Sequence, residues 1–160
     1  ASQVTDGASA VMVTSESFAA ANNLPVKAII LGYGEASLAP EIMGLGPVDA
    51  SKEALKRAGL TMADIDIVEL NEAFAAQSIA VMKEFEKQGH KIDPAKVNLD
   101  GGAIAMGHPL GASGARIVGH LSEVLQRENK RYGLATMCIG GGQGVAMVIE
   151  NPAAAPKPSV

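Results

Sequence analysis

The sequence predicts an α/β fold in which a mixed sheet of about five strands carries helices on both faces. Short apolar runs alternate with segments of helical periodicity from residue 8 to residue 128, the pattern of strands connected by helices. Two apolar runs then end the pattern with only a glycine turn between them, which makes them antiparallel. With 160 residues, 48% apolar and 19% charged, the chain can bury one hydrophobic core.

The expected strands are short aliphatic runs bounded by glycine, asparagine or polar residues. They cover residues 8–14, 26–31, 65–70, 132–139 and 145–149. The second strand is expected to leave the sheet through Gly32-Tyr33-Gly34, because paired glycines are typical of turns. The third ends at Asn71, and the fourth runs into the turn Gly140-Gly141-Gly142.

The expected helices have one apolar face and a recognisable start or stop. They cover residues 16–21, 47–58, 74–88 and 112–128. Ser15 can cap the first, Pro47 suits the first position of the second, and Gly59 suits its end. Thr61 to Asp64 reads as a short capped turn. The buried stripe of the third helix is expected at Phe74, Val81, Met82 and Phe85, and that of the last at Ile117, Val118, Leu121 and Leu125.

Composition excludes several kinds of protein. A net charge of −4, with three Phe, two Tyr and no Trp, argues against nucleic-acid binding. No apolar run approaches the roughly 20 residues that span a bilayer, and the start carries no signal-peptide pattern, so no membrane contact is expected. A single cysteine rules out an internal disulfide and a multi-thiolate zinc site, and we expect no metal and a cytoplasmic location.

The two ends predict how the chain is organised. It begins without Met and enters its first apolar run within a few residues, so we expect it to be a piece of a longer protein. Residues 1–150 are expected to form one domain. Residues 151–160, rich in Pro and Ala, are expected to form a flexible tail.

Three side chains are candidates for chemistry. Cys138 is either a small buried hydrophobe, as most lone strand cysteines are, or an acid or base whose pKa can be tuned to neutral pH. His108 lies between Gly107 and Pro109 before a helix, where little side-chain cover is expected, whereas His90 and His120 read as solvated or packed. Asn71 either caps the following helix or holds a water or carbonyl oxygen.

Two glycine-rich segments resemble nucleotide-binding motifs but lack features that those motifs require. Residues 102–107 have phosphate-loop spacing, but His108 and Pro109 replace the required Lys and Ser or Thr. Residues 140–144 lead into a strand and not a helix, so no helix N-terminus is available for a pyrophosphate.

Three stretches in order resemble the thiolase family. They are Asn71-Glu72-Ala73-Phe74, the glycine-rich residues 101–116, and Cys138-Ile139-Gly140-Gly141-Gly142-Gln143-Gly144. The resemblance runs from Ser2 to Glu150 and implies the C-terminal half of a thiolase subunit, of βαβαβαββ topology. It also implies that the N-terminal half, which carries the acylated cysteine, is absent here, so this chain alone is expected to be inactive.

The resemblance also implies roles for residues. Cys138 corresponds to the acid and base at the α-carbon of acetyl-CoA, and His108 to the group that activates the nucleophile and lines an oxyanion hole. Asn71 corresponds to the residue that holds a water in that hole, and the Gly140 N–H to a donor in a second hole. The residues expected to contact the acyl group or the pantetheine arm are Ser2, Met43 and Phe74.

The function implied is acyl transfer between CoA thioesters, by thiolysis of 3-ketoacyl-CoA or Claisen condensation of acetyl-CoA. CoA and acyl-CoA are then substrates, no cofactor is needed, and the complete subunit forms a homo-oligomer, a dimer or a tetramer. Cys138 argues against the ketoacyl synthases, which have His or Asn there. A non-catalytic oligomerisation or acyl-CoA-binding module is the alternative.

Overall fold

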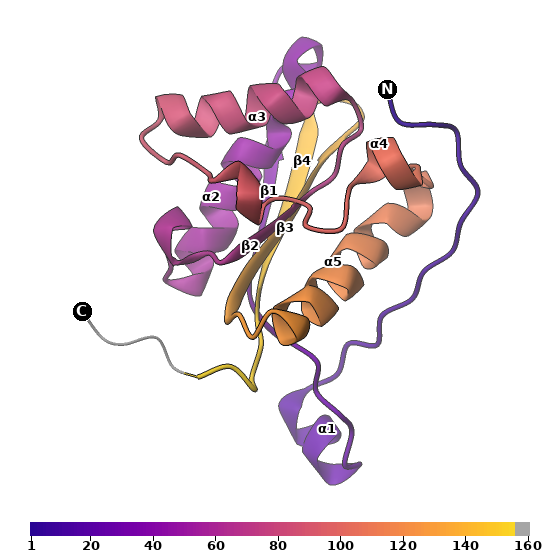
Figure 1. Cartoon of the computed structure of the whole chain (residues 1–160), viewed down its shortest axis with the longest axis vertical. Helices are drawn as coiled ribbons and strands as arrows, with labels where there is room; N and C mark the ends of the chain where they lie inside the picture. The colour runs from indigo at the N-terminus through magenta and orange to yellow at the C-terminus, as the bar shows by residue number, and fades with distance from the viewer. Residues whose placement is uncertain (156–160) are drawn as a thin grey trace.

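A computed structural model of the chain describes residues 1–155, in which one sheet lies between helices (Figure 1). Within these residues four strands pair in the order β1-β4-β3-β2. They are β1 (Ile29–Ser37), β2 (Ile67–Leu70), β3 (Tyr132–Ile139) and β4 (Gln143–Glu150). The pairing of β2 with β3 is parallel, and the other two pairings are antiparallel. The sheet is therefore mixed, as predicted.

Helices cover both faces of the sheet, which confirms the α/β class. The α-helices are α1 (Glu16–Ala21), α2 (Gly46–Ala58), α3 (Ala75–Lys87), α4 (Ala103–Met106) and α5 (Leu110–Arg127). The 3-10 turns are η1 (Pro40–Leu45), η2 (Met62–Asp64) and η3 (Pro94–Lys96). Figure 1 shows α2 and α3 on one side of the strands and α5 on the other. We refer to these sides as the α2 face and the α5 face.

The predicted helix signals are in place. Ser15 Oγ accepts a hydrogen bond from the Phe18 N–H over 3.2 Å and caps α1. Gly59 ends α2 in the left-handed region with φ 66°. Thr61 and Asp64 form a reciprocal capping box. The short α4, inside the glycine-rich stretch, was not predicted.

The strand predicted at residues 8–14 is wrong, and the sheet has four strands and not five. This segment is extended but has no neighbour in the sheet, and Val11, Met12 and Val13 are 45%, 81% and 70% exposed. An apolar run becomes a strand only where another strand accepts its backbone hydrogen bonds.

The predicted exit of the second strand at Gly32-Tyr33-Gly34 is also wrong, because β1 continues through these residues to Ser37. The glycines serve close packing and not a turn. A Cβ on Gly32 would lie 2.4 Å from the Ala54 carbonyl oxygen of α2, and one on Gly34 would lie 2.1 Å from that of Ala50. Glycine lets the helix backbone approach the strand.

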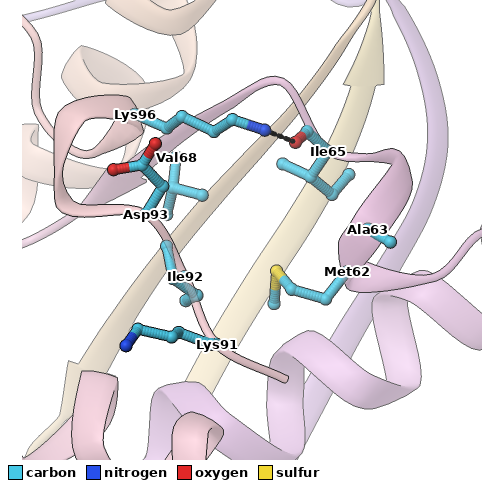
Figure 2. A pocket seen from close by; sticks show the side chains of 8 residues that line it. All are labelled: Met62, Ala63, Ile65, Val68, Lys91, Ile92, Asp93 and Lys96. Carbon is cyan, nitrogen blue, oxygen red and sulfur yellow. Dashed lines mark hydrogen bonds between the residues drawn. The ribbon is translucent and has the colours of Figure 1, made fainter. Parts of the chain in front are cut away.

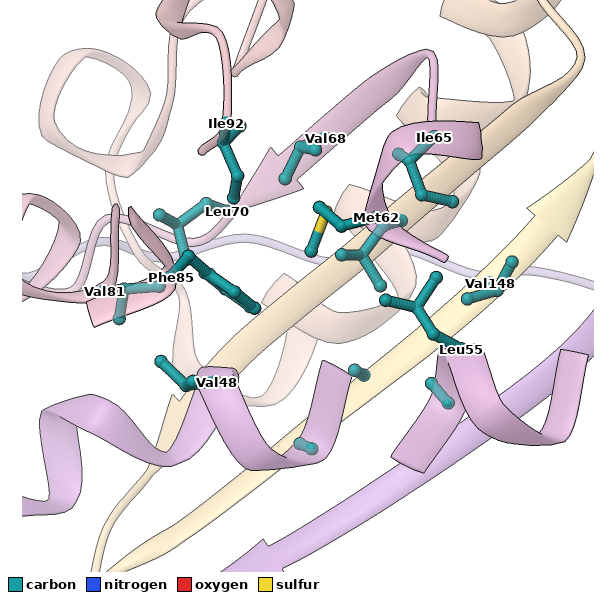
Figure 3. Close-up of a cluster of buried hydrophobic side chains, with 14 residues drawn as sticks. Val48, Leu55, Met62, Ile65, Val68, Leu70, Val81, Phe85, Ile92 and Val148 are labelled. Carbon is teal, nitrogen blue, oxygen red and sulfur yellow. The ribbon is translucent and has the colours of Figure 1, made fainter. Parts of the chain in front are cut away.

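Two apolar clusters form the core, one on each face. On the α2 face, Phe85, Val81 and Leu70 belong to a cluster with contributions from β2, β3, β4, α2 and α3 (Figure 3). On the α5 face, Ile117, Leu121 and Leu125 pack against the sheet. Phe74 does not extend the buried stripe of α3 as predicted, because it precedes the first helical residue and is 45% exposed.

The predicted domain of residues 1–150 and flexible tail of residues 151–160 remain predictions. Asn151 is 2% exposed, and its side-chain amide donates to the carbonyl oxygens of Leu125 and Lys130. Residues 156–160 of the predicted tail lie outside the described residues.

Candidate active site

Asn71 lies directly after β2, at the carboxyl edge of the parallel pair. Its N–H donates to the Thr136 carbonyl oxygen of β3 over 3.0 Å, and the residue is 1% exposed. Asn98 braces the last residue of β2 from the other side. Its side-chain amide accepts from the Leu70 N–H and donates to the Leu70 carbonyl oxygen, both over 2.9 Å. Backbone bonds therefore fix where Asn71 presents its side chain.

His108 lies in the loop between α4 and α5, where Gly107 makes the approach of the N-terminal segment possible. Gly107 has φ 94°, and a Cβ there would lie 2.3 Å from Thr5 Oγ1. The His108 N–H donates to the same oxygen over 3.3 Å. His108 is partly buried, although the glycines beside it predicted little cover.

The structure brings His108 and Asn71 together. Asn71 Nδ2 lies 3.3 Å from His108 Nε2, and Ser113 Oγ of α5 lies 2.6 Å from His108 Nδ1. Ser113 donates its own proton to the Pro109 carbonyl oxygen over 3.0 Å, which leaves it to accept from Nδ1–H. This pattern assigns the proton of neutral His108 to Nδ1 and makes Nε2 the acceptor of the Asn71 amide.

The surroundings of His108 favour the neutral ring. Burial lowers the pKa of His108, and the positive charge of Arg116 on α5 lowers it further. A neutral imidazole with an unprotonated Nε2 can take a proton from a thiol or from a water. The site therefore has the form of a histidine base with an amide beside it.

Cys138 lies on β3, where it pairs with Gly144 of β4, and is 5% exposed. Because Leu70 pairs with Thr136, Cys138 lies two residues further toward the edge at which Asn71 follows β2. Burial raises the pKa of the Cys138 thiol. Strand pairing places Cys138 at this edge, but the hydrogen bond of the Asn71–His108 pair does not include it.

The structure places the four remaining predicted site residues in different settings. Gly140 is in the exposed turn after β3, with open space where a Cβ would be. Ser2 contacts the segment that follows Asn71, although the two are distant in sequence. The N–H and Oγ of Ser2 both donate to the Ala73 carbonyl oxygen, over 3.1 and 3.2 Å. Met43 is partly buried in η1, and exposed Phe74 precedes α3.

Sequence reasoning missed two residues that contact the His108 loop. Ser113 is fully buried against the histidine. Arg116 donates from Nη1 to the Gly107 carbonyl oxygen over 3.2 Å. Both follow His108 within the first turns of α5, and a search for polar residues on that part of the helix would have found them.

His120, expected to be solvated or packed, is instead part of a charged network. Its Nδ1 is 3.0 Å from Glu69 Oε1, and its Nε2 is 2.9 Å from Asp100 Oδ2, which also accepts from Arg127 over 2.7 Å. Burial raises the pKa of Glu69, and His120 opposes that shift. The hydrogen bond from Arg127 lowers the pKa of Asp100. The network stabilises β2 against α5.

The pockets in the described part of the chain include two small ones near the sheet. One of about 100 Å³ is lined by Met62, Ile65, Val68, Ile92 and neighbouring residues, with Lys96 donating to the Ile65 carbonyl oxygen over 3.5 Å (Figure 2). None of the predicted site residues lines it. The second, of about 70 Å³, is lined by Asn71, Glu69, Arg116 and His120 among others and lies directly behind the site.

Residues 1–155 contain no group of three or more His, Cys, Asp or Glu side chains arranged to hold a metal ion. No helix among them is both long and apolar enough to cross a membrane.

This fold is that of thiolase C-terminal domains. A family model described as "Thiolase, C-terminal domain" matches residues 24–151, and the chain belongs to this family. It is similar to solved structures of human mitochondrial 3-ketoacyl-CoA thiolase. One has a TM-score of 0.82 at 47% identity, covering 87% of this chain and 34% of that one. Another, in complex with CoA, has a TM-score of 0.81 at 46% identity, covering 86% and 34%.

Curated relatives give the same family. A 3-oxoadipyl-CoA/3-oxo-5,6-dehydrosuberyl-CoA thiolase of Escherichia coli K12 is 52% identical over 151 residues, covering 94% of this chain and 37% of that protein. An acetyl-CoA acetyltransferase of the same organism is 53% identical over 151 residues, covering 94% of this chain and 37% of that protein. The mouse mitochondrial 3-ketoacyl-CoA thiolase is 47% identical over 96% of this chain. The chain spans 37% to 38% of the length of such relatives.

Proposed function

We propose that this chain supplies the proton-transfer half of a thiolase active site. The complete enzyme transfers acyl groups between CoA thioesters, by thiolysis of 3-ketoacyl-CoA or by Claisen condensation of acetyl-CoA. CoA and acyl-CoA are its substrates, it needs no further cofactor, and the complete enzyme is a homo-oligomer, a dimer or a tetramer. The relatives are named for 3-ketoacyl-CoA, 3-oxoadipyl-CoA and acetyl-CoA, which supports this substrate class.

The observation that carries the proposal is the hydrogen bond between Asn71 and His108 at the edge where β3 presents Cys138. At Nε2 the neutral His108 takes the proton of a second, nucleophilic thiol, and the resulting thiolate attacks the acyl carbonyl carbon. The bond that breaks releases the acetyl-CoA enolate in thiolysis, or the CoA thiolate when acetyl-CoA is the acyl donor. The resulting imidazolium then donates to the oxygen on which negative charge develops. A lost donor of this kind typically costs about 2.7 to 4 kcal/mol of transition-state stabilisation.

Cys138 acts on the α-carbon in this proposal. As a thiolate it removes a proton from acetyl-CoA to form the enolate, and as a thiol it returns that proton when an enolate leaves. Burial raises the pKa of the Cys138 thiol, so the thiolate is a stronger base than an exposed one. The N–H of Gly140, in the exposed turn after β3, is the donor that we assign to a substrate carbonyl.

The second thiol must come from outside these residues, because Cys138 is the single cysteine of the chain. The chain alone is therefore expected not to cleave acetoacetyl-CoA. Adding the N-terminal segment of the E. coli acetyl-CoA acetyltransferase, a 53% identical relative, is expected to restore turnover. Turnover by the chain alone, free of contaminating thiolase, would overturn the assignment of the missing nucleophile.

The complemented enzyme also tests the role of Cys138. Cys138→Ser is expected to be acylated but to lose roughly 10²- to 10⁴-fold in deuterium exchange at the acetyl α-carbon, since a hydroxyl cannot shuttle a proton near neutral pH. Ser122→Ala is the control and keeps exchange, because Ser122 bonds only the carbonyl oxygen of Gly119 in its own helix. Normal exchange in Cys138→Ser with a lowered melting temperature would make the residue structural. Tight CoA binding without turnover would identify a binding module instead.

A further inference from the structure

Two buried polar atoms beside the His108–Asn71 pair have no hydrogen-bond partner within residues 1–155. They are Asn71 Oδ1 and Arg116 Nε. The first can only accept a hydrogen bond and the second can only donate one. Because buried polar atoms are nearly always paired in native proteins, both require a partner, and one small molecule with a donor and an acceptor can serve both.

Both residues line the cavity of about 70 Å³ behind the site. A water needs about 10 to 15 Å³ of such volume and two to four polar partners, so this cavity has room for one. A water bridging the two atoms would accept from Arg116 Nε–H and donate one proton to Asn71 Oδ1. Glu69, on the same wall and 3% exposed, supplies a carboxylate for the second proton.

Arg116 also reaches the other member of the pair. Its Nη1 donates to the Gly107 carbonyl oxygen over 3.2 Å, and Gly107 is the residue before His108. One guanidinium therefore holds the backbone beside the histidine and faces the cavity beside the asparagine. The charged and titratable side chains that line this cavity come from two elements. Arg116 and His120 belong to α5, and Glu69, which is paired with His120, belongs to β2.

We propose that Arg116 is a positioning residue for the His108–Asn71 pair, acting through an ordered water in this cavity and through its bond to Gly107. The water holds the Oδ1 end of the Asn71 amide, which leaves Nδ2 facing His108 Nε2. An amide turned by half a rotation would present Oδ1 and select the other tautomer of His108. This water lies in the pocket that Asn71 and Arg116 line, and His108 does not line that pocket.

The catalytic meaning of this inference rests on the proposed function, but its test needs no substrate. A crystal structure of the chain at about 1.5 Å or better is expected to show an oxygen within about 2.7 to 3.2 Å of both Asn71 Oδ1 and Arg116 Nε. A cavity filled by a side chain, or one without density between these two atoms, would overturn the bridge.

Imidazole NMR tests the positioning itself. The chain has three histidines, so the ring nitrogens of each can be assigned, and wild-type His108 is expected as a single neutral tautomer with the proton on Nδ1. Arg116→Met is expected to give a mixture of tautomers and an upward shift of the His108 pKa, because a nearby positive charge is removed. Exposed His90 should not change.

The matched control is Arg127→Met, which removes the same charge from the same helix. Arg127 bonds Asp100, so His120 is expected to respond and His108 is not. If Arg116→Met fails to fold, Arg116→Lys keeps the charge without Nε and is expected to mix tautomers while leaving the pKa of His108 low. An unchanged His108 in the folded Arg116 variant, or an equal response in Arg127→Met, would overturn the proposal. So would a wild-type His108 with its proton on Nε2.

Discussion

The two faces of the sheet are packed by different means. On the α2 face, main chain meets main chain, and a Cβ on Gly32 or Gly34 would collide with helix carbonyl oxygens at 2.4 and 2.1 Å. On the α5 face, the buried residues include Asn71, Glu69 and Ser113, around a cavity of about 70 Å³. The faces do not differ in whether they hold a pocket, since the pocket of about 100 Å³ is lined by Met62, Ile65 and Val68 of the α2-face cluster. They differ in the close backbone contact of β1 with α2 and in the polar side chains that surround Asn71 on the α5 face.

The two histidines on the α5 face differ in their hydrogen-bond partners. His108 is bonded by an amide and a hydroxyl, which are neutral, whereas His120 lies between the carboxylates of Glu69 and Asp100. Burial and the positive charge of Arg116 lower the pKa of His108, which favours its neutral form. In the proposed function His108 acts as a base, whereas His120 links α5 to β2 through Glu69.

The largest effect is expected on the α2 face. Gly34→Ala places a Cβ 2.1 Å from the Ala50 carbonyl oxygen, where backbone must move, and should lower the free energy of unfolding by roughly 3 kcal/mol. The control Gly111→Ala adds a methyl group to α5 in open space and should leave stability unchanged or raise it by up to about 1 kcal/mol. Urea unfolding followed by circular dichroism measures both. Equal stabilities for the two variants would break the comparison of the faces.

On the α5 face, Ser113→Ala should lower the free energy of unfolding by less than Gly34→Ala does, but it should change the tautomer of His108. The variant leaves His108 Nδ1 without its partner at 2.6 Å, at an expected cost of about 1 to 3 kcal/mol. The ring should then lose its single tautomer, which ¹⁵N shifts report. Ser122→Ala on the same helix removes a hydroxyl bonded only to Gly119 and should leave the His108 spectrum as in the wild type. A tautomer that survives Ser113→Ala would remove the serine from the site.

The charged network should give a smaller, pH-dependent effect. The pKa of Glu69 is raised in the folded protein, mainly by burial, so the folded state holds this proton more tightly than the unfolded state does. The stability from that proton is complete below the unfolded value of about 4.5 and is lost as pH rises through the folded pKa. Its slope is at most about 1.4 kcal/mol per pH unit.

Glu69→Gln cannot titrate, so its unfolding free energy should change less than that of the wild type between pH 4.5 and pH 7. Urea unfolding at a series of pH values measures the difference. Asp100→Asn is the comparison at the exposed end, where the carboxylate pKa is lowered and the sign is reversed. Parallel profiles for the wild type and Glu69→Gln would show that Glu69 keeps its unfolded pKa.

The contrast between the faces also explains what the sequence predicted well. Helix boundaries depend on local signals, and Ser15, Gly59 and the Thr61–Asp64 box lie where they were expected. His108 and Asn71 were recognisable because they stand at element ends among glycines or after a strand. The sequence did not predict that Asn71 Nδ2 and His108 Nε2 lie 3.3 Å apart, because that contact forms only in the folded chain.

Longer-range packing was not predictable in the same way. Gly32 and Gly34 read as a turn because nothing in their neighbourhood reveals that α2 crosses them. Residues 8–14 read as a strand because periodicity does not say whether a neighbouring strand is present. For residues 8–14 and for Gly32 and Gly34, the missing information is a contact between segments distant in sequence. Ser113 and Arg116 are different, because they contact the nearby residues His108 and Gly107 and only the orientation of their side chains was missing.

The smallest effect is expected outside both faces, at α1, which Figure 1 shows below the body of the domain. Ser15→Ala removes the cap whose Oγ accepts from the Phe18 N–H over 3.2 Å, at a local cost of about 1 kcal/mol. Amide exchange of α1 should speed up while the urea midpoint stays at the wild-type value, because the two faces carry the cooperative unit. Ser17→Ala, inside the helix, should leave exchange slow, since alanine is the better helix former. A urea midpoint lowered as far by Ser15→Ala as by Ser113→Ala would place α1 inside the cooperative unit, and the stability of the chain would then depend on more than its two faces.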